Sequence, residues 1–257
     1  MKLGLAGRHA LVTGGSKGIG YGIAAELVAE GAAVTICART PPEVTAATAA
    51  LSAVDGAAVS GVVCDVTSAE AVGAMMASLD RVDILVNNAG GAHPGGFEDL
   101  TDDDWQRDLD VKLFAQIRCV RAALPHLRRS PAPRVVNINA VYARYPDPAF
   151  FATSVNRAAC HNLTKVLAQQ YGPEGILVNS VNIGFVVTPQ WENIRARRAP
   201  SLSPDEFFAE LSAAEVPLGR FGRVDEVSGV VAFLASDRAS YITGAVIDVA
   251  GGMGKYS

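Results

Sequence analysis

The sequence lacks a strong net charge, a long apolar run and any pair of closely spaced cysteines, and each absence excludes a class of protein. A formal net charge of −4 over 257 residues argues against nucleic acid as a main partner. No apolar run approaches the roughly 18 residues of a membrane span, and the N-terminus lacks the apolar core of a secretory signal. We therefore expect a cytoplasmic protein without a membrane partner. No Cys-x-x-Cys pair indicates a metal site, so the four cysteines are expected to be reduced thiols: Cys37, Cys64, Cys119 and Cys160.

The sequence is rich in short apolar segments. Hydrophobic residues make up 49% of the chain and charged residues 19%, which predicts a single ordered domain over residues 1–257. Runs typical of buried strands alternate with helical patterns throughout. This alternation predicts an α/β fold of the doubly wound (Rossmann) type, with a parallel sheet of about seven strands and helices on both faces. Strands are expected near residues 10–13, 33–38, 59–64, 84–87, 134–139, 177–182 and 245–249.

A glycine-rich turn joins the first expected strand to the first expected helix. It lies in residues 10–22, which read ALVTGGSKGIGYG. Gly14, Gly18 and Gly20 stand where a side chain would block the turn, a bound phosphate or the packing of helix on strand. A helix beginning near Gly18 directs free N–H groups and the positive end of its dipole at the turn, so a pyrophosphate is the favoured ligand. We predict a dinucleotide site formed by Gly14, Ser16, Lys17, Gly18, Ile19 and Gly20.

An acid is missing from the end of the second expected strand, where dinucleotide folds contact the adenosine ribose. A carboxylate there holds the 2′-hydroxyl of NAD and repels a 2′-phosphate. This chain has Ala38 at that place, followed by Arg39, and Lys17 lies in the glycine turn. Two cations and no acid favour a phosphorylated ribose, so we predict NADP(H) as the cofactor. The alternative is that both cations only face solvent.

Three later segments carry helix or loop signals. Residues 67–70 read Thr-x-x-Glu, which predicts a capping box for a helix ending near residue 79. Residues 101–104 read Thr-x-x-Asp, which predicts a cap for one long helix over 102–128. Residues 190–216 combine arginines and prolines with short amphipathic pieces, which predicts a mobile lid over the substrate site.

Short motifs follow one another along almost the whole chain. They are Thr13-Gly14-x-x-x-Gly18-Ile19-Gly20, Cys64-Asp65-Val66, Asn87-Asn88-Ala89-Gly90, Val136-Asn137-Ile138, Leu163-Thr164-Lys165, Val178-Asn179, Gly184 through Thr188-Pro189, and Gly251-Gly252. In this order they resemble the short-chain dehydrogenase/reductase family. The resemblance implies a small-molecule substrate and assembly as a homodimer or homotetramer. It also implies cofactor contacts from Asp65 and Val66 to the adenine, from Asn87, Ala89 and Gly90 to the ribose and nicotinamide, and from Val186 and Thr188 to the carboxamide.

The family's catalytic residues are replaced at the matching positions. The family uses an Asn, a Ser and a Tyr-x-x-x-Lys pair, in which the phenol passes a proton and the lysine lowers its pKa. Alignment of the motifs puts Lys112, Ala140, Thr153 and Arg157 at these four positions. A threonine hydroxyl is far too weak an acid for the phenol's role and Ala140 offers no donor, although Arg157 can still bind ribose hydroxyls. Lys112 and Arg157 are expected to repel each other unless an acidic or phosphate group lies between them.

Three functions are compatible with this sequence. The first is an NADP(H)-dependent carbonyl reductase or alcohol dehydrogenase with another proton donor, for which Tyr142, Tyr145 and His93 are candidates. The second is a dehydration, isomerisation or cyclisation on the same scaffold, in which arginines of the expected lid receive an anionic substrate. These arginines are Arg195, Arg197 and Arg198. The third is a non-catalytic NADP(H) sensor or partner subunit.

Overall fold

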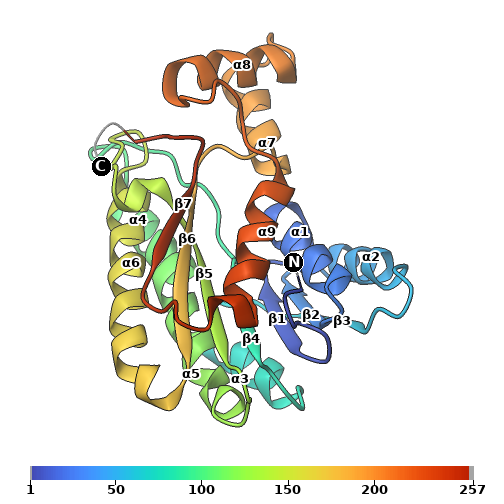
Figure 1. Cartoon of the computed structure of the whole chain (residues 1–257). Coiled ribbons are helices and arrows are strands. Elements are labelled where there is room, and N and C mark those ends of the chain that lie inside the picture. The colour runs from blue at the N-terminus through green and yellow to red at the C-terminus, as the bar shows by residue number, and fades with distance from the viewer. Residues whose placement is uncertain (1, 255–257) are drawn as a thin grey trace.

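The structure, a computed structural model, describes residues 2–254 of the chain. Within them seven strands form one parallel sheet in the order β3-β2-β1-β4-β5-β6-β7 (Figure 1). This arrangement confirms the predicted doubly wound α/β fold. The chain order reverses between β1 and β4, and ligands of such sheets bind near that point, beyond the carboxyl ends of the strands. The strands are β1 His9–Thr13, β2 Ala33–Ala38, β3 Val59–Val63, β4 Ile84–Asn87, β5 Arg134–Ala140, β6 Leu177–Ile183 and β7 Val246–Val249.

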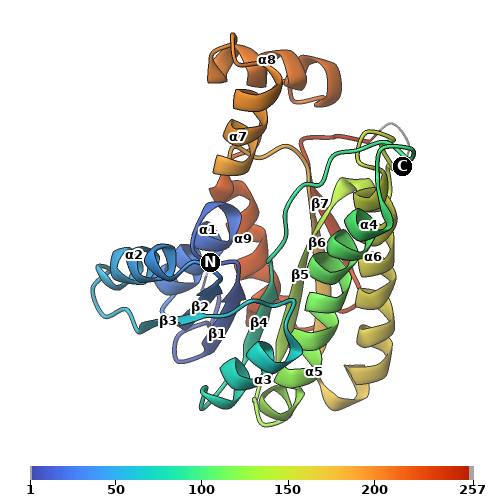
Figure 2. The same cartoon turned by 180° about the vertical axis from the view of Figure 1, so that it is seen from behind.

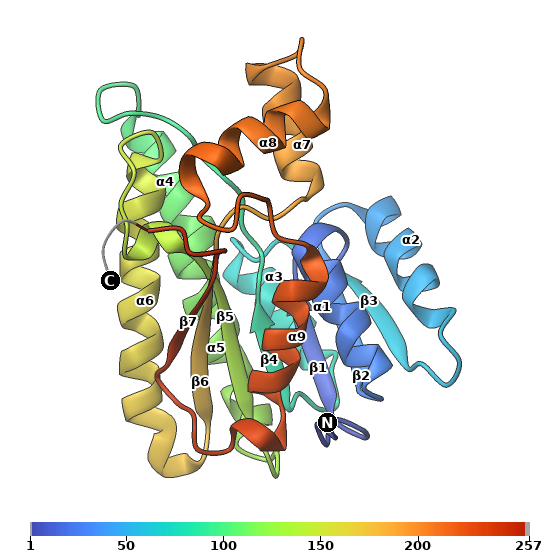
Figure 3. The same ribbon diagram turned by 45° about the horizontal axis from the view of Figure 1, so that its top comes forward.

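Helices cover both faces of the sheet (Figures 2 and 3). On one face α1, α2 and α9 bury apolar side chains such as Leu27, Leu51 and Val231 against the strands. On the other face α3, α5 and α6 do the same with side chains such as Met75 and Val120. Because both faces are covered, the central strands β1 (HALVT) and β4 (ILVN) are mostly apolar rather than alternating. The helices are α1 Gly18–Ala29, α2 Pro41–Ser52, α3 Ala69–Ala77, α4 Asp102–Leu109, α5 Ala115–Leu127, α6 Phe151–Tyr171, α7 Pro189–Arg198, α8 Pro204–Glu215 and α9 Val224–Ala235.

The segment expected to be a lid forms α7 and α8, which stand beyond the carboxyl ends of the strands (Figure 1). A small apolar cluster lies beneath them. Phe185 stacks on Phe221 with ring centroids 5.1 Å apart, and Trp191 meets both rings edge-on. This cluster ties the base of α7 to the loop that precedes α9. It is separate from the two core clusters that cover the sheet.

One of the two predicted capping boxes is wrong. The box at Thr101 and Asp104 is confirmed at the start of α4. At the other site the backbone N–H and the hydroxyl of Thr67 both donate to Asp65, at 2.9 and 2.8 Å. Because Asp65 already engages Thr67, the cap of α3 moves one residue on, and Ser68 accepts the bond from the Ala71 N–H at 3.2 Å.

The long helix expected over 102–128 is interrupted. A π-helical turn, η1 (Asp110–Phe114), separates α4 from α5. Such a turn inserts an extra residue into a helix and occurs frequently at functional sites. Lys112 lies in this turn, and its side chain is among the largest fully buried ones in the described residues. The helical periodicity of the sequence carries no sign of this change.

Several expectations from composition can be checked on residues 2–254. Within that part of the chain no helix is both long and apolar enough to cross a bilayer. The same residues hold no cluster of three His, Cys, Asp or Glu side chains arranged to bind a metal ion. All four cysteines are buried free thiols, as the sequence predicts.

Candidate active site

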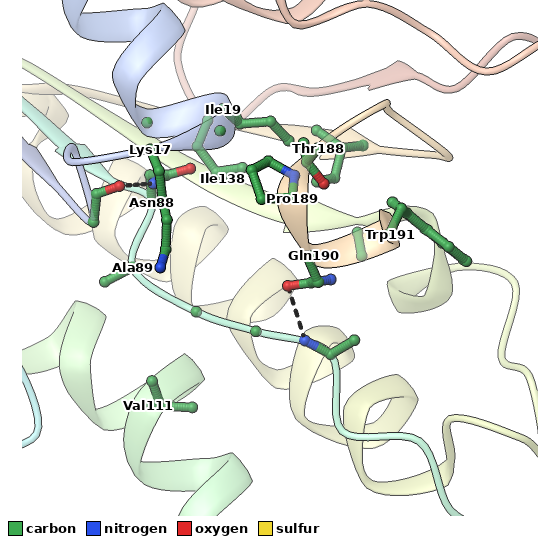
Figure 4. A pocket seen from close by; sticks show the side chains of 18 of the residues that line it. Lys17, Ile19, Asn88, Ala89, Val111, Ile138, Thr188, Pro189, Gln190 and Trp191 are labelled. Carbon is green, nitrogen blue, oxygen red and sulfur yellow. Dashed lines mark hydrogen bonds between the residues drawn. The ribbon is translucent and has the colours of Figure 1, made fainter. Parts of the chain in front are cut away.

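A pocket of about 590 Å³ opens at the carboxyl ends of the strands. The glycine turn, the ends of β2 and β3 and the loop after β4 form one side of it. The start of α6 and the inner side of α7 form the other side, so residues far apart in the sequence share one cavity. Figure 4 shows Lys17 and Ile19 from the turn, Asn88 and Ala89 from the loop, and Thr188 at the start of α7 around this space.

The glycine turn has the close backbone approach that the sequence predicts. Gly14 and Gly18 adopt φ of +63° and +56°, which L-residues with side chains rarely adopt. A Cβ on Gly20 would lie 2.2 Å from the Gly14 carbonyl oxygen and 2.4 Å from Nδ2 of Asn88. Asn88 Nδ2 in turn donates to the carbonyls of Thr13 (2.9 Å) and Gly14 (3.1 Å). The loop after β4 is thereby fastened to the turn, and helix α1 begins directly against it.

The start of α1 fits a pyrophosphate. Lys17 is the N-cap residue, and its side chain makes no capping hydrogen bond. The first N–H groups of the helix therefore remain available to an anion in the pocket. Gly18, Ile19 and Gly20, the first residues of α1, all line the cavity.

Both signs of charge meet where the adenosine would lie. Lys17 and Arg39 line the pocket as predicted, but so does Glu43 in the first turn of α2. The Lys17 Nζ lies 3.0 Å from a Glu43 carboxylate oxygen, and Ser16 donates to the same carboxylate at 3.4 Å. The sequence did not point to Glu43, because the acid that distinguishes NAD from NADP is expected at the end of the second strand, where Ala38 lies five positions earlier. A ligand phosphate at this place would share Lys17 with Glu43.

Asp65 and Val66 line the pocket where the adenine is expected. Partial burial acts to raise the pKa of Asp65, but the two hydrogen bonds from Thr67 and the nearby charge of Arg39 outweigh it and lower the pKa. Asp65 is therefore ionised at neutral pH, and its carboxylate is held in a fixed orientation by Thr67.

The loop after β4 differs from the prediction at one residue. Ala89 and Gly90 line the pocket, but the side chain of Asn87 is buried and donates to Asn137 Oδ1 at 2.8 Å. Of the two asparagines in this motif, Asn88 lines the pocket and Asn87 is not among the described residues that line it. The reason is that Asn87 is the last residue of β4, where its side chain lies beside its register partner Asn137 on β5, whereas Asn88 already belongs to the loop.

The far side of this region is formed by residues 186–189. Val186 pairs with Gly222 in an isolated bridge, which holds its backbone at the pocket wall. Thr188 stands opposite the glycine turn, since a Cβ on Gly18 would lie 3.7 Å from its side chain. Pro189 and Gln190 then begin α7 (Figure 4).

A buried cluster of polar side chains lies behind the catalytic end of the pocket. Lys112 is 1% exposed and forms an ion pair with Asp108, one helical turn earlier. Its Nζ also donates to Oγ1 of Thr153 at 2.9 Å. Asn156 donates to the other carboxylate oxygen of Asp108 at 2.8 Å. Thr153 lines the pocket, and its hydroxyl accepts from the buried ammonium group and donates to Asp108 at 3.3 Å.

The environment of Lys112 lowers its pKa toward the neutral range. Desolvation by burial is the largest cause, repulsion by Arg157 is the next, and the attraction of Asp108 opposes both. Together they lower the pKa of Lys112 to about 8. The expected repulsion between Lys112 and Arg157 is therefore present, and Asp108 is the acidic group that relieves it.

Arg157 is buried at the same end of the pocket. One guanidinium nitrogen donates to the carbonyl of Ile138 at 2.9 Å, and a second lies 3.2 Å from where a Cβ on Gly90 would be. Its Nε is buried and has no hydrogen-bond partner among the described residues. Burial also lowers the pKa of Arg157. A cation with unused donors at a cavity wall is suited to hold hydroxyl or anionic groups of a ligand.

Comparison with known proteins agrees with these features. A family model described as enoyl-(acyl carrier protein) reductase matches residues 14–254. The chain is 35% identical over 257 residues to the 3-oxoacyl-[acyl-carrier-protein] reductase FabG of Pseudomonas aeruginosa, covering 98% of this chain and 99% of that protein. This chain therefore belongs to the short-chain dehydrogenase/reductase family.

Two related structures are especially informative. A short chain oxidoreductase from Pseudomonas aeruginosa PAO1, described as containing an atypical catalytic center, superposes with a TM-score of 0.92 at 38% identity, over 99% of this chain and 100% of that one. The same protein has been solved with NADPH bound. L-Sorbose reductase from Gluconobacter frateurii, complexed with NADPH and L-sorbose, superposes with a TM-score of 0.96 at 29% identity over the whole of both chains.

The candidate proton donors Tyr142 and His93 differ in position. Tyr142 lines the pocket and stacks on Phe150 with centroids 5.0 Å apart, and burial raises its pKa, which makes it a weaker acid than an ordinary phenol. His93 lies 3.4 Å from Asp104 and is not among the described residues that line the cavity. Ala140 lines the cavity and contributes no side-chain donor.

Sequence reasoning also missed Asp108 and Asn156. The spacing of Asp108 and Lys112, four residues apart on an expected helix, was a signal that could have found the ion pair. Nothing in the sequence indicated that Asn156, from a helix more than forty residues later, would bond to Asp108.

Proposed function

We propose that this member of the family is an NADP(H)-dependent oxidoreductase that interconverts a carbonyl and an alcohol, with Lys112 rather than a tyrosine as the proton source. One observation carries the proposal. Thr153 lines the same cavity as the glycine turn, and its hydroxyl receives a hydrogen bond from the buried, pKa-lowered Lys112.

The residues present fit the cofactor. The first N–H groups of α1 suit a pyrophosphate, Lys17 and Arg39 suit a 2′-phosphate, and Asp65 with Val66 suits the adenine. Asn88, Gly90 and Arg157 are placed for the nicotinamide ribose, and Val186 and Thr188 for the carboxamide. The NADPH complexes of the two related proteins support this assignment. When bound, NADP(H) would supply or accept the hydride.

The proton would move through two side chains of the protein. During reduction the Thr153 hydroxyl turns from Asp108 to the substrate and gives its proton to the carbonyl oxygen, and Lys112 Nζ gives a proton to Thr153 Oγ1. The threonine thus ends unchanged and Lys112 ends neutral. Thr153 needs no unusual acidity of its own, because it conducts a proton that Lys112 supplies. In alcohol oxidation both transfers run backwards.

The surrounding residues position this pair. The Asp108 carboxylate accepts hydrogen bonds from Lys112, from Asn156 and, at 3.3 Å, from the Thr153 hydroxyl. Asp108 therefore holds both members of the pair next to each other. The guanidinium of Arg157, which also lines the pocket, would stabilise negative charge that develops on the substrate oxygen.

The test is consumption of NADPH with a panel of ketones, followed by two substitutions. Lys112→Met and Thr153→Val should each lower kcat by about 100-fold or more, because general acid catalysis contributes on that order. Lys165→Met is the matched control, since this lysine lies on α6 and donates to the carbonyl of Gly244 away from the cavity. If Lys112→Met retains the wild-type rate while Lys165→Met does too, the relay is wrong.

The two other functions predict different results from the same protein. A dehydratase, isomerase or cyclase would form product without nucleotide. A cofactor sensor would bind NADPH tightly and reduce none of the panel. The expected replacement of the family's serine by Ala140 and the weak acidity of Tyr142 favour the sensor.

A further inference from the structure

The charged residues that line the pocket are divided by sign along its length. At the adenosine end both signs occur, with Lys17 and Arg39 facing Glu43 and Asp65. The remaining charged residues that line the cavity, among those described, are all arginines: Arg157, Arg197 and Arg198. Of these three, Arg157 is assigned to the cofactor and the developing oxyanion, which leaves the positive charge of Arg197 and Arg198 without a role in the proposed reaction.

Helix α7 directs two of its three arginines into the cavity. Arg197 and Arg198 line it, and neither forms an ion pair within residues 2–254. Arg195, on the same helix, instead donates to the carbonyl of Leu202 at 2.8 Å and does not line the cavity. Basic residues in the last turn of a helix stabilise it through the helix dipole, but that effect does not decide which of them face the pocket.

Arg198 lies close to the catalytic end. Its guanidinium carbon is 5.9 Å from the centre of the Phe150 ring, and Phe150 is the residue immediately before α6, which carries Thr153. Phe150 stacks on Tyr142, whose pKa is raised by burial, and the charge of Arg198 opposes that rise. Two carboxylates near Tyr142, Asp147 and Glu215, raise that pKa, but they do not line the cavity.

Aromatic rings fill the wall between Thr153 and the arginines of α7. Tyr142, Phe150, Phe185 and Trp191 all line the cavity. A bond from the Ala92 N–H to Oε1 of Gln190, at 3.3 Å, ties the first turn of α7 to the loop after β4 (Figure 4). This tie keeps α7, and with it the arginines of its last turn, beside the pocket.

We infer that Arg197 and Arg198 form an anion subsite, and that the substrate is a carbonyl or alcohol compound with an apolar body and an anionic group, a carboxylate or a phosphate ester, at the end away from the reacting carbon. This inference rests on the proposed function, because it assigns the reacting carbon to the Thr153 side of the cavity. Guanidinium groups bind carboxylates and phosphates in the same bidentate way, so the two arginines predict an anionic group without distinguishing between these two. The exposed positive charge of these two arginines also attracts anionic substrates from solution.

The test compares three ketones with the same aromatic body: one carrying a carboxylate, one its methyl ester, and one a phosphate ester. Wild-type protein should use the anionic ketones with a KM at least tenfold below that of the methyl ester, and the better of the two identifies the natural anion. The double variant Arg197→Gln/Arg198→Gln should raise the KM of the anionic ketones about tenfold or more, with kcat changed less than twofold and the methyl ester unaffected.

Arg195→Gln is the matched control, because it removes the same charge from the same helix outside the cavity. It should change anionic and neutral ketones equally. The inference is overturned if wild-type protein does not distinguish the three ketones, or if the double variant shifts the KM of the ester as much as that of the acids.

A binding measurement separates this inference from the proposed function. Aromatic carboxylic acids without a ketone are titrated into the NADPH-loaded protein by calorimetry, with the corresponding amides as neutral probes. If no ketone is reduced, the proposed function fails, yet tighter binding of the acid than of the amide, lost in the double variant and kept in Arg195→Gln, still supports the subsite. Equal binding of acid and amide overturns it.

Discussion

Raising the pH should slow carbonyl reduction, because it removes the proton from Lys112 before the substrate can receive it. The perturbation acts on one group: the buried ammonium that bonds to Thr153 and is paired with Asp108. Desolvation and the charge of Arg157 bring its pKa to about 8. An ordinary lysine would stay charged throughout the range in which enzymes are usually assayed.

The size of the effect follows from this pKa. With a pKa of about 8, the protonated fraction is about 0.9 at about pH 7 and about 0.1 at about pH 9. We therefore expect kcat for reduction to fall about tenfold between these two pH values. Alcohol oxidation needs the neutral amine, so its kcat should rise by a similar factor over the same interval.

The assay is steady-state turnover at saturating ketone and NADPH, with a solvent isotope effect to show that proton transfer limits the rate. Lys112→Arg supplies the control, since a guanidinium keeps its proton at every pH tested and should give a lower and flat profile. Arg157→Gln removes the second cause of the shift, so the inflection should move to higher pH. A wild-type profile that is flat from pH 7 to 9, or an inflection that persists in Lys112→Arg, would refute the assignment of Lys112.

The same lysine makes stability depend on pH. Its folded-state pKa lies below that of the unfolded chain, so between about 8 and its ordinary value the unfolded state binds the extra proton. This group therefore makes the free energy of unfolding rise with pH across that window.

Three further predictions concern the rest of the site. Gly20→Ala should destabilise the fold by about 1–3 kcal/mol and abolish NADPH binding, because its Cβ would lie 2.2 Å from a carbonyl oxygen of the glycine turn. The control Gly73→Ala, in open space on α3, should stabilise the fold by about 0.5–1 kcal/mol. Equal effects of the two variants in thermal unfolding would contradict the packing argument. Glu43→Gln should lower the Kd of NADPH severalfold but not that of NADH, because the substitution frees Lys17 for the 2′-phosphate. A parallel change in the Kd of both cofactors in a fluorescence titration would count against this prediction. Tyr142→Phe and His93→Ala should leave kcat and its pH profile within about twofold of wild type, because neither supplies the proton in the proposed relay; a large loss in either variant would return that residue to the role of donor.

Local patterns predicted most of the architecture. Each predicted strand lies within one or two residues of its observed bounds, because short apolar runs between turn signals have few other ways to become buried. The glycine turn was equally accessible, since positive φ at Gly14 and Gly18 and the contact at Gly20 are demands that glycine alone meets. The cap of α3 was not, because Thr67 had two possible partners and the nearer one, Asp65, engaged it.

By itself the sequence determined the doubly wound fold and the place of the nucleotide turn, and it predicted that the family's four catalytic residues are replaced. These features depend on periodicity, on backbone conformation and on residue identity, all of which are local. Only the tertiary structure decided which side chains meet: it joined Lys112 to Asp108 and Thr153, joined Asn156 to Asp108, placed Glu43 beside Lys17, and buried Asn87 in the core. Proton affinity and charge pairing depend on neighbours brought close by packing, and the pattern along a single chain does not contain those distances.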